Sequence, residues 1–267
     1  MITPAAFTPA AFTPAAFIAH GSPMNALASN DFTSAWRAFG QRVGTPSAVL
    51  VISAHWYIGA TAVTAMSAPR TIHDFSGFPA ELSAFNYPAP GSPTLAKHIA
   101  DLLAPTTVIL DETQWGLDHG TWSVLTHVFP NADVPVVQLS IDARQSPEWH
   151  VDLATRLAPL RNEGICIIGS GNIVHNLGIV DTSMTARAFD WAREFDRRAQ
   201  DLITSDHPAD LISVLELSDA YRAVPTLEHF LPAVYIAGVV KASGDHLETF
   251  VEGGDWGSVT MTSYQTV

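Results

Sequence analysis

The sequence contains a single cysteine, few basic residues and no long apolar run. Cys166 lies inside the short apolar run 165–168, so no intrachain disulfide can form and the thiol is predicted to be a core side chain. Only 13 lysines and arginines stand against 26 acids, a net charge of -13 that argues against a nucleic-acid partner. No stretch is long enough to cross a bilayer, and the first basic residue is Arg37, so the positive flank of a signal peptide is missing. We therefore expect a cytoplasmic, acidic protein that has neither a membrane nor a nucleic-acid partner.

Several motifs that define enzyme classes are also missing. The sequence has no HExxH, no cysteine cluster, and neither GxGxxG nor GxxxxGK[ST] before a helix. The turn 169–171 could cradle a phosphate, but no lysine follows it. The residues around Ser170 do not form the GxSxG of serine hydrolases. The chemistry of this chain therefore has to come from other residues.

Short apolar runs alternate with amphipathic segments along the chain, and 47% of its 267 residues are apolar, which is ample for a core. The run 48–52 is rich in β-branched residues and is typical of a strand buried on both faces. We predict an α/β fold: a single-domain, three-layer-like structure with a central mixed, largely parallel sheet flanked by helices. The expected strands are 17–19, 48–52, 61–66, 107–110, 134–141, 164–168 and 258–264. The expected helices are 30–41, 94–103, 147–160, 185–203 and a last one through 240.

The sequence also makes specific predictions for the N-terminal segment and for the last helix. Residues 3–17 repeat the pentamer TPAAF three times, a period too short and too rich in proline for a helix or a solenoid. We interpret residues 1–12 as a low-complexity N-terminal tail and residues 13–267 as the folded domain. Near the other end, Thr226 is expected to cap the last helix, which places His229 at its third position.

Five of the eleven histidines stand at strand ends, in Gly-rich turns or at a helix start. The strand 17–19 runs into His20 and the strand 48–52 leads to His55, so two neighbouring strands are expected to deliver imidazoles to one place. His119, His175 and His229 complete the set. Because imidazole is both the commonest metal ligand and the usual proton shuttle near neutral pH, the set predicts a divalent-metal site with a base beside it. The sequence leaves His73 undecided, and surface positions, structural or solvated, are expected for His98, His127, His150, His207 and His246.

Eight segments, in chain order, carry a family resemblance: FIAHGSPMNAL, SAHWY, TIHDFSGFPAEL, NYPAPGSP, WGLDHGTWSVL, VPVVQLSID, GSGNIVHNLG and EHFLPAVYIAG. Together they resemble the LigB-type class III extradiol ring-cleavage dioxygenases, and most closely the 4,5-DOPA extradiol dioxygenase branch. The resemblance runs from Phe17 to Gln265, so it implies that residues 13–267 form an extradiol dioxygenase catalytic domain. The TPAAF tail is not part of it.

The resemblance implies metal ligands at His20, His55 and His229. His175 matches the family's catalytic base, which also approaches the metal in a zinc-loaded form. His119 matches a second active-site histidine that holds substrate or oxygen. The implied cofactor is non-haem Fe(II) for activity, and Zn(II) is expected in the purified protein because three neutral imidazoles suit both ions.

The implied reaction is extradiol cleavage of a catechol, such as a DOPA-like compound, by O2 to a ring-opened semialdehyde. In it His175 removes a proton from the diol, whose acidity the metal raises, and later returns it as a general acid. Phe75, Trp115 and Trp122 are expected to wall the substrate pocket, although plain packing explains each of them equally well. The implied partners are a small aromatic diol and O2; a homo-oligomer is left open.

Two other functions stay open on the residues alone. A zinc-dependent hydrolase would explain the histidines but not the family segments outside them. A non-catalytic member of the fold that binds a metal or a partner is the second alternative. The five histidines argue against it, because a binding module needs no proton shuttle.

Overall fold

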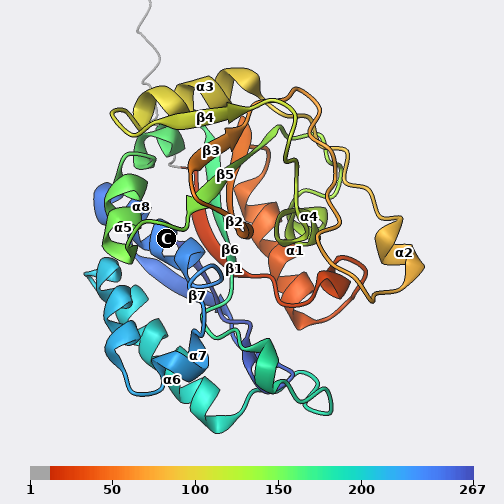
Figure 1. The fold of residues 1–267 in the computed structure, drawn as a ribbon, viewed down its shortest axis with the longest axis vertical. Helices are drawn as coiled ribbons and strands as arrows, with labels where there is room; N and C mark the ends of the chain where they lie inside the picture. Colours follow the sequence, from red (N-terminus) through yellow and green to blue (C-terminus); the bar gives the residue numbers. More distant parts are fainter. Residues whose placement is uncertain (1–12) are drawn as a thin grey trace, which may run out of the picture.

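The computed structural model describes residues 13–267, so the predicted tail 1–12 lies outside the described residues. Its centre is an eight-stranded sheet with the strand order β4-β3-β5-β2-β6-β1-β10-β7 (Figure 1). The strands of this sheet are β1 (Ala15–Ala19), β2 (Ala48–Ile58), β3 (Thr61–Thr64), β4 (Val108–Asp111), β5 (Val136–Asp142), β6 (Ile165–Gly171), β7 (Leu247–Val251) and β10 (Ser263–Thr266). A separate two-stranded ribbon joins β8 (Gly254–Asp255) to β9 (Val259–Thr260).

The middle of the sheet is parallel. Strand β6 pairs in parallel with both β1 and β2, and β2 pairs in parallel with β5. Strand β3 joins antiparallel to β5, and β10 and β7 close the other edge antiparallel. The predicted mixed, largely parallel sheet is therefore confirmed. All four central strands end at the same edge, which is where open α/β sheets build their sites.

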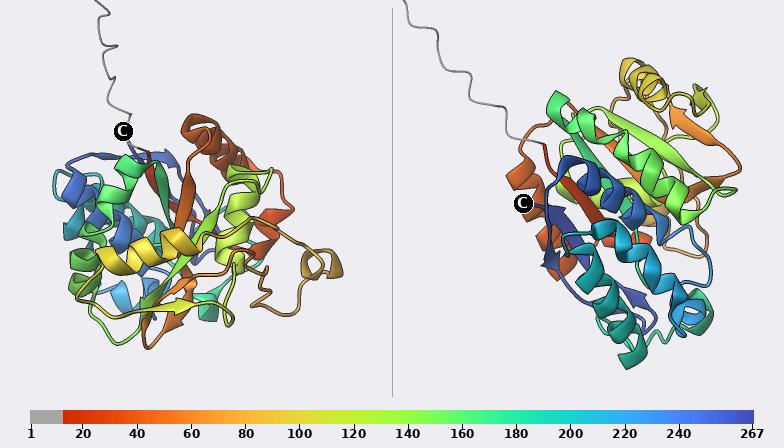
Figure 2. Two further views of the ribbon diagram at one scale, coloured as in Figure 1. Left: turned by 90° about the horizontal axis from the view of Figure 1, so that it is seen from above. Right: turned by 90° about the vertical axis from the view of Figure 1, so that its left-hand side faces the viewer.

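Helices cover both faces of the sheet, as the three-layer prediction requires (Figure 1). On one side α1 packs on α4, which contacts β2 and β6; on the other α5 packs on α8, which contacts β6, β1 and β2. In the right-hand view of Figure 2, helices of the C-terminal half, in cyan and blue, cover the face turned to the viewer. The helices are α1 (Asp31–Val43), α2 (Ala80–Ser83), α3 (Pro93–Leu102), α4 (His119–Val128), α5 (Pro147–Thr155), α6 (Asp190–Ile203), α7 (Ala220–Ala223) and α8 (Leu231–Ser243). Short 3-10 helices are Pro23–Ala26, Ala158–Glu163, Leu177–Ile179 and Pro208–Glu216.

Local sequence explains where several elements begin and end. The Asn30 side chain accepts a hydrogen bond from Thr33 N at 2.9 Å, which caps α1. The run 48–52 in β2 is buried throughout, because helices lie on both of its faces. Helix α8 is apolar all round and fully buried from Leu231 to Val240, which makes it the central helix of its layer.

Several predicted boundaries are wrong, including that of the helix 147–160, which ends at Thr155. The Thr226 hydroxyl donates to Glu228 Oε1 at 2.7 Å and caps nothing, and α8 begins only at Leu231, with Pro232 in its first turn. His229 therefore precedes the helix and is not its third residue. The segment 185–203 becomes helical only from Asp190, and 258–264 is split between β9 and β10. No helix among the described residues is long and apolar enough to span a membrane.

Candidate metal centre

All five singled-out histidines meet in one place. One side-chain nitrogen from each of His20, His55 and His229 lies within 4.8 Å of the other two. The His119 ring centroid is 3.8 Å from that of His55. The His175 ring stacks on His229, with centroids 3.5 Å apart and planes inclined by 9°. The histidine cluster predicted from strand ends and turns is therefore present in the fold.

The strands that deliver the first two ligands are not neighbours. The sequence predicts that the strands ending in His20 and leading to His55 lie side by side, but β6 separates β1 from β2. Ser170 of β6 pairs with Ile18 on one side and with Ser53 on the other. Two strand spacings amount to about 9.6 Å, and the two imidazoles bridge that gap from both sides. Their Nε2 atoms are 3.1 Å apart.

Hydrogen bonds fix which nitrogen of each ring carries the proton. The Ser170 hydroxyl donates to the Gly120 carbonyl oxygen at 2.5 Å, so it can only accept from His20 Nδ1–H, which lies 3.0 Å away. His55 Nδ1–H donates to the Asp74 carboxylate, which only accepts, at 3.1 Å. When both rings are neutral, Nε2 of each therefore has a bare lone pair, and these are the two nitrogens that face each other.

This donor set fits a divalent metal ion. Two lone pairs 3.1 Å apart repel each other unless a cation lies between them. Imidazoles bound to one ion at 2.0–2.1 Å, with ligand angles between octahedral and tetrahedral, place their nitrogens about 2.8–3.4 Å apart. The third ring is fixed in the same way, because His229 Nδ1 lies 3.3 Å from Glu228 Oε1, which leaves Nε2 free. His20, His55 and His229 thus offer three imidazole nitrogens that could hold one metal ion.

Burial and neighbouring charges set the pKa values of the cluster. Burial lowers the pKa of His20 and of His229 well below the usual value, and the other histidines lower it further. Burial also lowers the pKa of His55, but its hydrogen bond to Asp74 and the nearby Asp118 carboxylate outweigh this, so that pKa ends above its usual value. Burial raises the pKa of Asp74, but hydrogen bonds from two histidines hold it well below its usual range.

Asp74 is the functional residue that sequence reasoning missed. Its Oδ1 accepts from both the backbone N–H of His119 at 3.0 Å and His119 Nδ1 at 2.9 Å, and its Oδ2 serves His55. One carboxylate therefore fixes the tautomer and orientation of two rings, which is the usual task of a carboxylate behind a metal-binding histidine. The signal was its position in the long aromatic loop 70–93, directly before Phe75.

We expect Asp74→Asn to weaken metal binding about 10- to 100-fold. If the asparagine oxygen keeps its bonds to His119, its NH2 group faces His55 Nδ1 and forces that ring to carry its proton on Nε2. The lone pair that points to the metal is then lost. Competition with a chromophoric chelator measures the affinity. Asp152→Asn, an exposed residue of α5, removes the same charge as the control. Equal affinities in the two variants would show that Asp74 does not orient the ligands.

The start of α4 places His119 against the cluster. The Asp118 side chain accepts from Thr121 N at 3.1 Å and caps the helix, so His119 is its first residue. Gly120 permits the close approach to β2, because a Cβ there would lie 2.5 Å from Ser53 Oγ. Since His119 Nδ1–H is committed to the carboxylate behind it, its Nε2 is a free hydrogen-bond acceptor.

The end of β6 places the last two histidines. A Cβ at Gly171 would lie 2.2 Å from the His229 carbonyl oxygen, so glycine lets the turn before α8 approach the strand. Asn172 N donates to the same carbonyl at 2.8 Å. His175 N donates to Ala223 O at 3.0 Å, and burial, followed by the charge of His55, lowers the pKa of the His175 ring to about 4.

A cavity of about 250 Å³ opens above these rings. Phe75 lines it together with Phe78 and Trp256, so the cavity combines aromatic side chains with polar imidazoles. A pocket with apolar walls and a few convergent polar groups is typical of a small-molecule site. The full lining is His20, Gly21, Ser22, Pro23, His55, Asp74, Phe75, Phe78, His119, His175, Leu177, His229, Asp255, Trp256 and Val259.

Trp115 and Trp122, which were expected to wall the substrate pocket, do not line this cavity. Trp115 stacks on Trp56 with ring centroids 5.7 Å apart. Trp122 is fully buried, stacks on Phe85, and donates from Nε1 to the Ile72 carbonyl at 2.8 Å. Its polar edge is therefore used to hold the loop that carries Asp74.

Two further histidines, for which surface positions were expected, are buried instead. His127 is buried and donates from Nε2 to the Asn25 carbonyl at 2.7 Å. His150 is buried against Tyr235, whose hydroxyl lies 3.0 Å from its Nδ1. Both are structural. His73 lies outside the cluster, with Nε2 2.9 Å from the Phe85 carbonyl oxygen.

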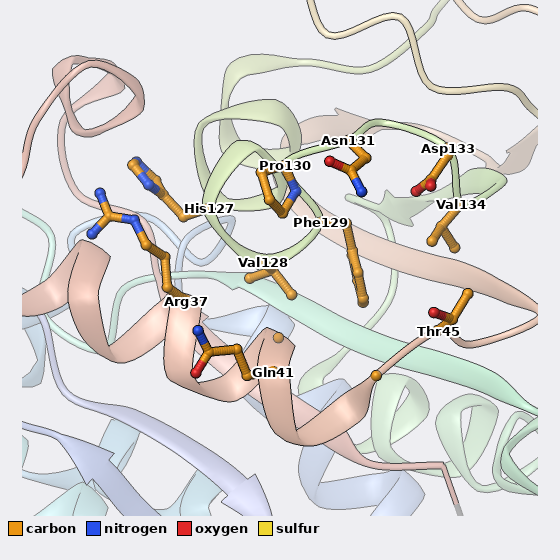
Figure 3. Close-up of a pocket in the computed structure, with 12 residues that line it drawn as sticks. Arg37, Gln41, Thr45, His127, Val128, Phe129, Pro130, Asn131, Asp133 and Val134 are labelled. Carbon is orange, nitrogen blue, oxygen red and sulfur yellow. The ribbon is translucent and has the colours of Figure 1, made fainter.

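A larger hollow of about 340 Å³ lies elsewhere, between α1 and the segment after α4 (Figure 3). Arg37 and His127 stand at one end of it, and Thr45 and Val134 stand at the other. No group of three metal-ligating side chains among the described residues falls in this hollow. Size alone therefore does not mark the site; the arrangement of donors does.

A family model described as the catalytic LigB subunit of aromatic ring-opening dioxygenase matches residues 14–263. The chain belongs to this family. It is an extradiol aromatic ring-opening dioxygenase, a metal-dependent enzyme that acts on an aromatic substrate with O2, and its histidine cluster supplies groups able to hold the metal. The resemblance seen in the eight sequence segments is confirmed.

Two named relatives and one crystal structure are similar to this chain over most of its length. The chain is 43% identical over 251 residues to the 4,5-DOPA dioxygenase extradiol of Escherichia coli (strain K12), covering 93% of this chain and 92% of the relative. It is 36% identical over 258 residues to the protein of the same name from Beta vulgaris, covering 93% and 94%. The crystal structure of an uncharacterized protein from Escherichia coli K12 matches with a TM-score of 0.82 at 39% identity, over 95% of this chain and 99% of that one.

Proposed function

We propose that this enzyme cleaves a catechol of the DOPA type beside its two hydroxyl groups and releases a ring-opened semialdehyde. The observation that carries the proposal is the set of three imidazoles with bare nitrogens at the floor of a cavity with aromatic walls. Two of those nitrogens, on His20 and His55, are 3.1 Å apart. The relatives named 4,5-DOPA dioxygenase extradiol support the same substrate class.

In this proposal His20, His55 and His229 hold Fe(II), which supplies the redox chemistry between the catechol and O2 when it is bound. With three imidazoles as its ligands, the metal would remain accessible to the substrate from the cavity. Zn(II) fits the same ligands and is expected in the purified protein, because zinc binds nitrogen donors more tightly than Fe(II) does. Zinc has no accessible redox change, so the zinc form binds a catechol without turning it over.

The residues around the ligands orient the substrate and keep water out. The free Nε2 of His119 accepts a hydrogen bond from a diol hydroxyl, because its other nitrogen is locked to Asp74. Phe75 and Phe78 pack edge to face, with centroids 5.2 Å apart, and form an apolar wall for the ring of the substrate. The wall also excludes water from the reacting edge.

His175 is the general base and acid in this proposal. It lines the cavity, and its side chain makes no hydrogen bond to another described residue, so a ring nitrogen is available to the substrate. The ring is held flat against His229 and its backbone is fixed by Ala223. His175 removes a proton from a diol hydroxyl, holds it on the ring and returns it to an oxygen of the ring-opened product.

The test compares two metal forms of the same protein. Apoprotein is loaded anaerobically with Fe(II) or with Zn(II), and 4-methylcatechol or DOPA is added in air-saturated buffer. We expect the Fe(II) form to consume one O2 per catechol while a yellow ring-opened product appears, and the zinc form to consume none. Equal O2 uptake by both forms would contradict the redox role of iron. No uptake by either form, with catechol shown to bind, would overturn the proposed reaction.

A further inference from the structure

The substrate cavity contains acids but no lysine or arginine. Among the described residues that line it, the only charged groups besides the histidines are Asp74 and Asp255. Asp74 is fully used, because its two oxygens accept from His119 and His55. Asp255 is therefore the one carboxylate of the lining that remains for a ligand.

The Asp255 side chain is anchored by one oxygen and open at the other. Its Oδ1 accepts from the backbone N–H of Ala186 and of Trp256, both at 3.0 Å. For Oδ2, no hydrogen bond or ion pair with another residue of 13–267 is found. The N–H of Ala186 and a Trp256 N–H shared with the Met184 carbonyl oxygen hold the carboxylate in place on β8, so its second oxygen can meet a cation without a new side-chain arrangement.

The residue that follows Asp255 in the chain supplies an indole to the same cavity. Trp256 follows Asp255 and also lines the cavity, and its backbone has a left-handed φ of 50°, which is uncommon for a bulky residue. Neighbouring backbone bonds hold that conformation: Trp256 N donates to Met184 O at 3.1 Å, and Trp256 O accepts from Asp181 N at 2.9 Å. A carboxylate and an indole that line the same cavity are a combination that recognises an ammonium group.

We propose that Asp255 and Trp256 bind a positively charged side chain of the substrate, so that the enzyme selects catechols that carry an ammonium group over those that carry only a carboxylate. The inference rests on the proposed function, because it assigns the diol end of the substrate to the histidine cluster. A lone carboxylate in this cavity meets no lysine or arginine and is repelled by Asp255 and by the net charge of -13. The selectivity therefore has two sources: Asp255 attracts catechols that carry an ammonium group and repels catechols that carry only a carboxylate.

Three catechols that differ in side-chain charge test the proposal: dopamine is cationic, 4-methylcatechol is neutral and 3,4-dihydroxyphenylacetate is anionic. With Fe(II)-loaded wild type we expect kcat/KM to fall in that order. Asp255→Asn keeps an oxygen that accepts from both backbone N–H groups, so the hairpin is preserved while the charge is lost. We expect the ratio of kcat/KM for dopamine over 3,4-dihydroxyphenylacetate to fall about 10- to 100-fold in this variant, as for a lost charge-assisted hydrogen bond. The same loss of charge at the exposed Asp152, in Asp152→Asn, leaves the ratio unchanged.

Binding to the zinc-loaded protein provides a readout that does not depend on turnover. Calorimetric Kd values for the same three catechols are expected to follow the same order, and the preference for dopamine is expected to shrink in Asp255→Asn. If Fe(II) protein turns over no catechol while these Kd values behave as stated, the proposed function fails and the selectivity stands. If Asp255→Asn keeps the wild-type discrimination in both assays, or if wild type prefers the anionic catechol, the selectivity is overturned.

Discussion

Replacing His175 by alanine is expected to lower kcat/KM for a catechol about 10²- to 10⁴-fold, the usual range for the loss of a general acid or base. Metal affinity is expected to stay near the wild-type value, because His175 does not belong to the group of ligands formed by His20, His55 and His229. O2 uptake by Fe(II)-loaded protein measures the first quantity, and chelator competition measures the second.

Two comparisons make the His175 result specific. His207→Ala removes an exposed histidine outside the site and is expected to change neither quantity. His175, Glu228 and His229 form another group of side chains that could hold a metal ion. A large loss of metal affinity in His175→Ala would therefore assign His175 as a metal ligand. Full activity at confirmed iron occupancy would show that another group moves the proton.

The part of the site that follows from single strands and turns could be predicted from the sequence. A buried β-branched run that leads to His55, and a shorter one that ends in His20, place both rings at the carboxyl edge of the sheet. The order of the strands could not be predicted, because the pairing of β6 between β1 and β2 is a long-range choice without a local pattern. The start of α8 was misjudged for a related reason: Thr226 has the chemistry of a cap, but its hydroxyl bonds to Glu228.

Asp74 and Trp122 show why the surroundings of the ligands escaped prediction. The bonds from Asp74 to His119 join residues 45 positions apart, so neither neighbour nor spacing in the sequence reveals them. A tryptophan near Gly and His residues predicts a pocket wall and a core side chain equally well. In the fold, the Trp122 ring is buried and its N–H supports Ile72, two residues before that carboxylate. Trp122 thus supports the loop and does not line the cavity.

Replacing His20 by alanine is expected to weaken Zn(II) binding about 10²- to 10³-fold, and to abolish O2 uptake at one equivalent of Fe(II). Structural zinc sites with four ligands bind with about 10–16 kcal/mol, so one ligand accounts for roughly 2.5–4 kcal/mol. The loss also removes the partner that faces His55 Nε2 at 3.1 Å and leaves Ser170 Oγ without its donor. Chelator competition on the apoprotein gives the affinity.

Because the His20 side chain is buried, alanine also leaves a cavity, so the folded state of the variant is checked by its thermal unfolding. His20→Gln fills more of the space but supplies no imidazole, and it is expected to show the same loss of metal binding. His207→Ala again provides the matched control, since it removes a histidine and keeps the three convergent nitrogens. A folded His20→Gln protein that binds zinc as tightly as wild type would show that other side chains hold the metal. The group formed by His55, Asp74 and His119 would then be the alternative set of ligands.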